Sequence, residues 1–429
     1  MAMVVKNNMS AVSTLNTLNK NSSALAKSLQ KVSSGMKINS AADDASGYAI
    51  SERMRVQIRG LDQANQNTQN GTSMMKVAEG AVSSTVDILK TLKEKVINAA
   101  NDTNTDSDRA TIQKELDQSI DQINDNANVT YNGKYLVDGS KNAATKGTTT
   151  ALTNESLYSS TKFDDAFTSL KDRNGNSLNI TSTDTVTMSW VKEGVTCTAS
   201  VKADGKLSAL VAKATDMATT TEGSLIGKDM AGDKVTTADG GKALTILAKK
   251  LGVENQISGL SFSVTNTKGQ VQKSANAVLD NFTESIRAQN QSSDNAISLQ
   301  VGTKANQSIK VGLTDMRAEA LGLQSSTGKT IQIGTQKQAN AAINVLDNAV
   351  QKALDQQTTI GAVQSRLSYT SSNLTTASEN VQSSESTIRD ADMAKEMTEY
   401  TKNNVLLQAA QSMLAQANQS SSSVLSLLQ

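Results

Sequence analysis

Apolar residues recur at matching helical spacings near the two ends of this chain, and this pattern limits what the chain can fold into. Within residues 1–36 and again within residues 406–428, they fall mostly three, four or seven residues apart. A helix cannot bury such a stripe alone, so each stripe needs a partner. Taken by themselves, the stripes are typical of packing within one chain, with assembly between chains as the alternative. The apolar residues of this candidate assembly surface are Val5, Val12, Leu15, Leu18, Leu25, Leu29, Val32, Leu406, Met413, Leu414, Val424, Leu425 and Leu428.

The composition favours long helices over large globular cores. The chain has 429 residues, enough for two or three domains, but only 37% are hydrophobic and 3% aromatic. It contains no proline, whereas average usage would give about 5%. Helices therefore need not break, and folding has no slow prolyl step. We interpret this as fitting a chain that is unfolded, moved and refolded.

The residues that are missing argue against most enzyme classes. There is no histidine, and Cys197 is the one cysteine. A histidine-based triad, a histidine-ligated zinc site and an intramolecular disulfide are therefore excluded. We expect no enzyme activity, no cofactor and no metal site, and we interpret Asp43 and Asp44 as helix-start capping residues.

The charge balance and hydropathy address possible partners. The net charge is +1, from 42 basic and 41 acidic residues, so no basic field points to nucleic acid. No run of 18 apolar residues predicts a membrane span, and residues 1–10 lack the pattern of a cleaved secretory signal. We expect neither nucleic-acid nor membrane binding.

The periodicity changes along the chain from helical to alternating and back. Helical spacing covers residues 1–36, where residues 33–35 interrupt it, and residues 39–44 are expected to form a connector. A longer helical region follows to about residue 100, and helical spacing resumes after a polar turn at 101–104 that Thr105 caps. From residue 338 the chain is helical almost to its end. Helices at both ends thus flank an inserted middle.

The middle, residues 141–285, is predicted to be mixed or β-rich. Alternation around Trp190 and again around Cys197, with Gly194 between them, predicts a hairpin. A second hairpin is expected at 297–313, after the insert. Helical stretches are expected at 207–217, 240–251 and 273–290.

Several stretches of the chain closely resemble bacterial flagellin. They are residues 28–47, 58–61, 64–67 and 79–81 near one end, and residues 312–322, 383–394 and 408–418 near the other. The resemblance covers about residues 1–140 and 290–429, and it does not extend to 141–285. With it, assembly between chains becomes the favoured interpretation of the terminal stripes.

The resemblance implies a non-enzymatic subunit that polymerises into the flagellar filament for swimming motility. It implies a mainly α fold with three parts: a terminal coiled coil (1–40 and 390–429), a helical rod domain with a β-hairpin (41–140 and 286–389), and the exposed insert (141–285). It also implies a secreted, extracellular protein, exported unfolded by the flagellar type III pathway. The implied partners are further copies of the chain, an export chaperone at the C-terminal helix, and the hook-junction and cap proteins.

Two alternatives stay open at this point. A hook–filament junction protein would share the terminal helices, and an insert that binds carbohydrate or surfaces would add a function to a filament subunit.

One family motif is degenerate in this chain. Many flagellins carry a Gln-Arg-x-Arg-Glu-Leu-x-x-Gln stretch that Toll-like receptor 5 recognises. In the matching segment, Lys93 and Glu94 keep the pattern's charges, while Thr91, Lys95 and Asn98 replace an arginine, a leucine and a glutamine. Since arginine and large apolar anchors often dominate interfaces, we expect weak receptor activation. The whole receptor-facing segment consists of Lys90, Thr91, Lys93, Glu94, Lys95 and Asn98.

Overall fold

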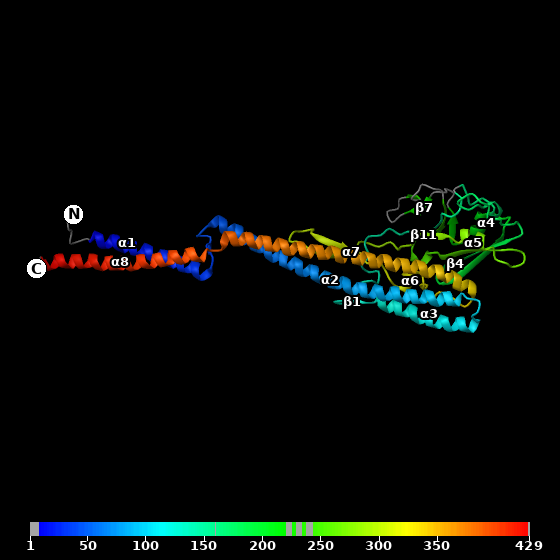
Figure 1. Ribbon diagram of the computed structural model, residues 1–429, viewed down its shortest axis with the longest axis horizontal. Helices are drawn as coiled ribbons and strands as arrows, with labels where there is room; N and C mark the ends of the chain where they lie inside the picture. The colour runs from blue at the N-terminus through cyan, green and yellow to red at the C-terminus, as the bar shows by residue number, and fades with distance from the viewer. Residues whose placement is uncertain (1–7, 159, 220–224, 229–233, 237–242, 428–429) are drawn as a thin grey trace. The chain divides into compact units, whose positions relative to one another are not determined.

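The computed structural model is mainly helical, with long helices toward both ends of the chain and most of the strands between them (Figure 1). It describes residues 8–158, 160–219, 225–228, 234–236 and 243–427. The helices are α1 (Met9–Ser34), α2 (Ala45–Ala99), α3 (Asp106–Ala127), α4 (Leu207–Ala212), α5 (Lys273–Leu279), α6 (Ala318–Leu321), α7 (Gln336–Arg389) and α8 (Met393–Leu427). The strands are β1 (Thr130–Tyr131), β2 (Lys134–Tyr135), β3 (Ala151–Asn154), β4 (Thr185–Lys192), β5 (Val195–Lys202), β6 (Met217–Thr219), β7 (Leu225–Lys228), β8 (Lys234–Thr236), β9 (Leu244–Ala248), β10 (Ser258–Thr265), β11 (Phe282–Ile286), β12 (Ile297–Gln300) and β13 (Ser308–Val311).

The chain forms two compact units. The terminal unit comprises Met1–Thr68, Gln300–Gln307 and Tyr369–Gln429, and the central unit comprises Gln69–Leu299 and Ser308–Ser368. Helices α2 and α7 contribute residues to both.

In the terminal unit, α2 and α7 are joined more by polar side chains than by an apolar core. Leu61, Ala64 and Leu374 form a small buried cluster. Beside it, Ser371 Oγ donates to Asn65 Oδ1 at 2.7 Å, and Ser378 Oγ donates to Asp62 Oδ1 at 3.0 Å. Such hydrogen bonds fix the register of two helices but add little net stability each.

Capping interactions stabilise the turn between α2 and α3 in the central unit. The expected turn between α2 and α3 is confirmed, and Thr105 forms a capping box with Asp108. Arg109, which is buried, donates from Nε to the Ala99 carbonyl at 3.0 Å and from Nη2 to the Asn101 carbonyl at 3.1 Å. Arg109 thereby satisfies carbonyl groups at the end of α2 that a helix leaves unpaired.

The insert has its own core between two sheets. A three-stranded sheet has the order β10-β4-β5, and a four-stranded sheet has the order β11-β3-β9-β6. The expected hairpin is confirmed: Trp190 pairs with Cys197 across β4 and β5, and Glu193 and Gly194 turn the chain with positive φ angles. Trp190, Phe167 and Phe262 are buried in this core. The second expected hairpin is the β12–β13 pair.

Three helix predictions in the insert were wrong in whole or in part. Residues 240–251 contain strand β9, which lies between β3 and β6 and is buried along most of its length. A run buried on both faces lacks the alternation that identifies a strand. In the other two stretches the helix is short, since α4 ends at Ala212 and α5 ends at Leu279, before strand β11.

The two segments that connect the insert to the helices lie side by side. Thr145 forms an antiparallel bridge with Ser292, and Thr148 forms one with Gln289. The chain therefore enters and leaves the insert through one short, paired stalk.

Side chains of α5 cover the free edge of β10. Asn276 Oδ1 accepts a hydrogen bond from the Val264 amide at 2.8 Å, and Asp280 Oδ1 accepts one from the Phe262 amide. Burial raises the pKa of Asp280 to about 6, although the hydrogen bond from Phe262 opposes this shift. The protonated form of Asp280 is therefore the form that the fold favours.

We expect Asp280→Asn to stabilise the insert above pH 6. The protonated carboxyl contributes fully to the free energy of unfolding below its ordinary pKa near 3.8. This contribution is lost as the pH rises through the raised pKa of about 6. Asparagine keeps the acceptor oxygen without the charge, so the variant should gain roughly 1–3 kcal/mol at pH 7. Thermal unfolding followed by Trp190 fluorescence at pH 4 to 8 measures this gain. A difference between variant and wild type that stays constant with pH would contradict it.

Candidate functional site

Helices α1 and α8 pair in antiparallel orientation within the terminal unit. Asn8 Nδ2 donates to the Ala417 carbonyl at 3.1 Å, Asn21 Nδ2 donates to the Leu406 carbonyl at 3.2 Å, and Asn403 Nδ2 donates to Ser28 Oγ at 2.8 Å. These contacts join residues close to the two ends of the chain. The predicted pairing of the terminal helices is therefore present in a single molecule.

A heptad seam with few fully buried side chains joins the two helices. Within the residues whose side chains are described, Ser28 is the buried residue of α1, and Ala410 is that of α8. The seam side of α1 follows a spacing of three and four through Ala11, Thr14, Leu18, Asn21, Leu25, Ser28 and Val32, and Ala24 and Lys31 beside them are also partly shielded. The seam side of α8 follows the same spacing through Glu396, Tyr400, Asn403, Leu407, Ala410, Leu414 and Ala417, and Glu399 and Asn404 beside them are also partly shielded.

The predicted surface residues divide into two groups. Leu18, Leu25, Val32 and Leu414 are partly buried in the seam. The others are exposed on outer faces: Val12 (49%), Leu15, Leu29, Leu406 and Met413 (63%). One copy thus leaves a large part of its apolar terminal surface in water.

Some predicted residues have no description, and some seam residues were not predicted. Val5 and Leu428 lie outside the described residues, as do the side chains of Val424 and Leu425. Sequence reasoning chose Leu406 and missed its neighbour Leu407, which lies in the seam. The 4-3-4-3 spacing through Tyr400, Asn403 and Leu407 was a usable signal, but it passes through polar residues.

The two connectors of the terminal unit pair with each other. Gly35 ends α1 with a φ of 69°, and its carbonyl accepts from the Ala391 amide at 2.9 Å. The Lys37 amide donates to the Arg389 carbonyl at 2.7 Å. The connector at 35–44, which joins α1 to α2, is therefore hydrogen-bonded to the connector region at 390–392, which joins α7 to α8.

Two aspartates shape the first of these connectors: Asp44 caps the start of α2, as the capping interpretation expects, whereas Asp43 binds amides that precede it in the connector. Asp43 Oδ2 accepts from the amides of Asn39 and Ser40, and Asp44 Oδ1 accepts from those of Ser46 and Gly47. The hydrogen bonds from Ser40 and Asn39 hold the pKa of Asp43 below its usual value, although partial burial opposes them.

Arg389 is the charged residue at the centre of this junction. It is 5% exposed, donates from Nη1 to Glu52 Oε1 at 2.7 Å, and lies over the ring of Tyr48 at 5.5 Å from the centroid. The hydrogen bond from Arg389 holds the pKa of Glu52 below its usual value. A buried guanidinium with these partners ties the end of α7 to the start of α2.

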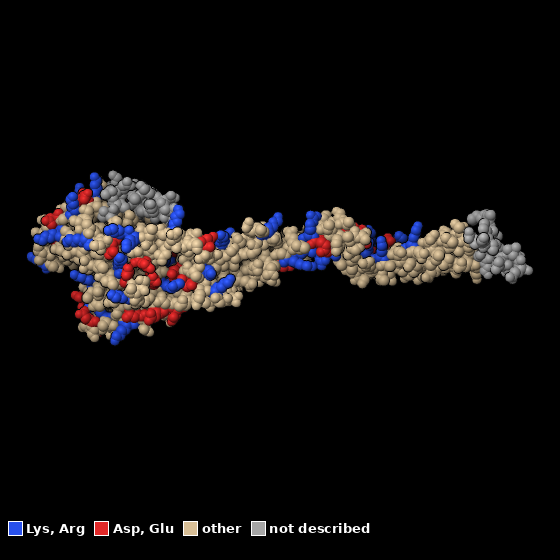
Figure 2. Space-filling view, turned by 180° about the vertical axis from the view of Figure 1, so that it is seen from behind, with Lys and Arg blue, Asp and Glu red and all other residues tan. Residues whose placement is uncertain are grey.

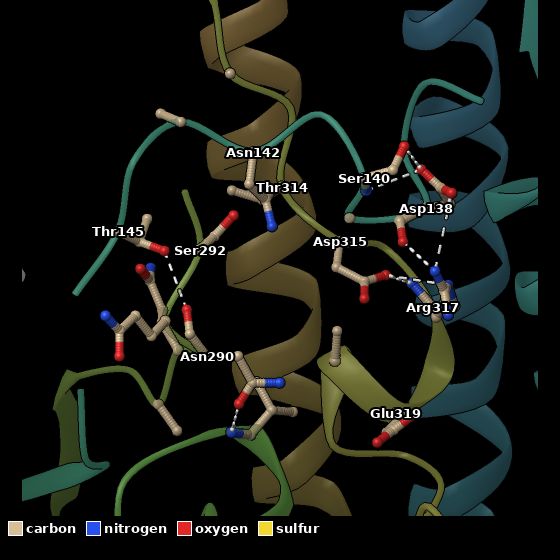
Figure 3. Close-up of a pocket in the computed structure, with 18 of the residues that line it drawn as sticks. Asp138, Ser140, Asn142, Thr145, Asn290, Ser292, Thr314, Asp315, Arg317 and Glu319 are labelled. Atoms are coloured by element: carbon tan, nitrogen blue, oxygen red, sulfur yellow. Dashed lines mark hydrogen bonds and ion pairs between the residues drawn. The ribbon is translucent and has the colours of Figure 1, made fainter. Parts of the chain in front are cut away.

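The central unit contains a cavity of about 480 Å³, shown in Figure 3. Arg317 lies between two carboxylates there, with its Nε 3.7 Å from Asp315 Oδ1 and its Nη2 3.9 Å from Asp138 Oδ2. Lys352 donates to the Ala320 carbonyl at 2.5 Å, and burial lowers its pKa. Burial also raises the pKa of Asp315. Opposite charges hold the lining segments together, and Ser140 Oγ donates to Asp138 Oδ1 at 2.6 Å.

The described residues offer neither a metal-binding cluster nor a membrane-spanning helix. They contain no group of three or more cysteine, aspartate or glutamate residues that is placed to hold a metal ion. None of the described helices is long and apolar enough to cross a membrane.

In the receptor-facing segment of α2, the lysine charges are already paired within the chain. Lys95 pairs with Glu115 at 3.0 Å, Lys90 pairs with Asp87 at 3.2 Å, and Lys93 pairs with Asp347. The side chains of Thr91, Glu94 and Asn98 are exposed. The Asn98 side chain accepts from Asn104 Nδ2 at 3.1 Å.

Comparison with known proteins assigns the family. Residues 5–142 match the model of the bacterial flagellin N-terminal helical region, and residues 343–428 match that of the C-terminal helical region. Flagellin of Clostridium tyrobutyricum is 34% identical, covering 97% of this chain and 99% of that protein. The chain belongs to the bacterial flagellin family. A flagellin of Bacillus subtilis strain 168 is 30% identical over 99% of this chain and 100% of its own length.

The family assignment places this flagellin among structural filament proteins, not enzymes. A solved structure of the flagellar junction protein FlgL from Legionella pneumophila is also similar, with 16% identity, a TM-score of 0.30, and coverage of 74% of this chain and 99% of that one. A score this low does not bear on the choice between a filament subunit and a junction protein. The near-complete matches to flagellins favour the filament subunit.

We expect Arg389→Gln to loosen the connectors of the terminal unit. The change removes the charged hydrogen bond to Glu52 and the cation over Tyr48, so protease cleavage within residues 35–44 should be at least about tenfold faster. Limited proteolysis with mapping of the fragments measures this rate. Lys395→Gln is the control, because it removes a charge from an exposed lysine of the same unit. Equal cleavage of the two variants would contradict the role given to Arg389.

Proposed function

We propose that this flagellin polymerises through the outer apolar faces of α1 and α8, which become the core of the flagellar filament. The observation that carries the proposal is the exposure of Val12, Leu15, Leu29, Leu406 and Met413 on a helix pair that already satisfies its seam. Exposed apolar surface of this extent is typical of an interface. Further copies of the same chain supply the missing partners, since all copies carry the same two faces.

We keep the three-part division as part of this proposal. Residues 1–40 with 390–429 form the core coiled coil, residues 41–140 with 286–389 form the rod, and residues 141–285 form the outward-facing insert. The junction of the paired connectors, at residues 35–44 and 390–392, supports the boundary between the first two parts. The self-contained core of the insert supports the third.

Export, chaperone binding and capping enter the proposal from the family. We propose that the chain is secreted unfolded through the flagellar type III pathway, that a chaperone shields α8 beforehand, and that junction and cap proteins contact the assembled subunits. The apolar outer face of α8 supports the need for a chaperone, because it is exposed to water before assembly.

We expect Leu406→Asp combined with Met413→Asp to abolish filaments. These residues lie seven apart on the outer side of α8. Each change removes roughly 1 kcal/mol of burial and introduces a charge that is costly to desolvate, so the critical concentration for polymerisation should rise at least about a hundredfold. Electron microscopy and sedimentation of purified subunits measure this, and circular dichroism checks that the monomer keeps its helices.

The matched control is Gln411→Asp combined with Asn418→Asp, which adds the same charge at the same spacing on exposed polar residues. Filaments lost equally in both variants would contradict an apolar interface. The variants can also be expressed in a motile bacterium that lacks its own filament protein. Monomer in the culture medium would then show that export succeeded and assembly failed, whereas its absence would indicate failed export. A wild-type chain that never polymerises, even on filament seeds, would favour the junction protein.

We expect weak activation of Toll-like receptor 5. Thr91, Lys95 and Asn98 depart from the recognised pattern, and the neighbouring lysines are paired within the chain. In a cell reporter, the potency should be at least about tenfold below that of a flagellin with the full motif. Restoring the motif with Thr91→Arg, Lys95→Leu and Asn98→Gln should raise the potency toward that level. Equal potency of the wild type and the restored variant would contradict this expectation.

A further inference from the structure

The N-terminal half of α2 carries two exposed arginines, Arg53 and Arg59, that have no ion-pair partner among the described residues. Arg53, Val56 and Arg59 recur three residues apart and are exposed, and Val56 is 69% exposed. Arg55, which lies between them, pairs with Glu52 at 3.4 Å. Among the described residues, no carboxylate lies within ion-pair distance of Arg53 or Arg59. Arginine is enriched at protein–protein interfaces relative to the rest of the surface, so two unpaired arginines beside an exposed apolar residue indicate a candidate contact surface.

The C-terminal half of α3 carries an acidic face whose exposed carboxylates have no cationic partner among the described residues. Asp117, Asp121 and Asp125 follow one another four residues apart. Asp117 is engaged by Gln113 and Thr330, but Asp121 and Asp125 are exposed, and the described part of the chain places no cation within ion-pair distance of them. Figure 2 shows acidic side chains gathered along the edge of the molecule that α3 forms.

This acidic face is electrostatically unfavourable in an isolated subunit. The last turn of α3 has no basic residue, although the negative end of the helix dipole lies there and favours cations. Like charges four residues apart also repel each other on a helix. A cation supplied from outside the subunit would relieve both effects.

The two faces match in charge and in spacing. Arg53 and Arg59 are about 9 Å apart along α2, while Asp121 and Asp125 are about 6 Å apart along α3, a difference that the long arginine side chains accommodate. Both faces belong to the same chain, so every copy offers one of each. A contact between two different faces of identical copies repeats from one copy to the next, and it produces a helical polymer where the rotation between copies does not close into a ring.

We propose that Arg53 and Arg59 of one copy pair with Asp121 and Asp125 of a neighbouring copy, with Val56 packed between the two helices. This inference rests on the proposed function, because it assigns one contact within the polymer. It adds a polar contact between subunits to the apolar core made by α1 and α8. In this arrangement the arginine–aspartate pairs align neighbouring subunits, and the apolar faces of α1 and α8 hold the subunits together.

Charge reversal tests the contact. We expect Arg53→Glu with Arg59→Glu, and separately Asp121→Lys with Asp125→Lys, each to raise the critical concentration for polymerisation at least about tenfold. The variant with all four changes restores the opposite charges and should polymerise within a few-fold of wild type. Lys171→Glu with Lys202→Glu is the control, since it changes the net charge as much at exposed lysines of the insert.

Mixing the two reversed pairs gives a second readout that does not need the fourfold variant. Each of the two proteins should polymerise poorly alone, whereas their mixture should form filaments that contain both near the wild-type critical concentration, because the acidic faces of one protein complement the basic faces of the other. If the variant with Arg53→Glu and Arg59→Glu polymerises as readily as the wild type, the proposed contact is overturned and the filament function stays intact. Failure of both the mixture and the fourfold variant to recover would overturn the assigned pairing. Failure of the wild type itself would instead count against the proposed function.

Discussion

The structure depends on the pairing of the two ends of one chain. Asn8 and Ala417 are 409 residues apart in sequence, yet they are joined by a hydrogen bond. Because α1 and α8 are antiparallel neighbours, the chain that leaves α1 must return to the same unit before α8 begins, and within that unit α2 lies beside α7. Arg389 and the paired connectors fix the place where the first helix pair gives way to the second.

The terminal unit is held by hydrogen bonds and an ion pair more than by buried apolar surface. Its cluster of Leu61, Ala64 and Leu374 is small, and the α1–α8 seam includes asparagine, serine and glutamate. Individual hydrogen bonds contribute modestly to net stability, so the unit is specified in register without being strongly stabilised. The insert differs, because aromatic and aliphatic side chains fill the space between its two sheets.

Sequence periodicity predicted the long helices, the β4–β5 and β12–β13 hairpins and the pairing of the chain ends, but it misplaced helices in the insert. It did not determine which side of a terminal helix faces its partner: Leu18 and Leu25 lie in the seam, whereas Val12 and Leu15 are exposed. A stripe that is apolar on adjacent sides permits either orientation, and only the partner's shape decides. The role of Arg389 has no local signature, because its partners Glu52 and Tyr48 are more than 300 residues away in sequence. Strand β9 was missed because an apolar run buried on both faces does not alternate.

The paired stalk below the insert has an evolutionary consequence. Its bridges, Thr145 with Ser292 and Thr148 with Gln289, hold the two crossing segments together whatever lies beyond them. The entropic cost of closing a loop grows only slowly with its length. An insert of another size or fold can therefore replace this one at the stalk without shifting the register of the long helices. The insert and the long helices are thereby free to evolve separately.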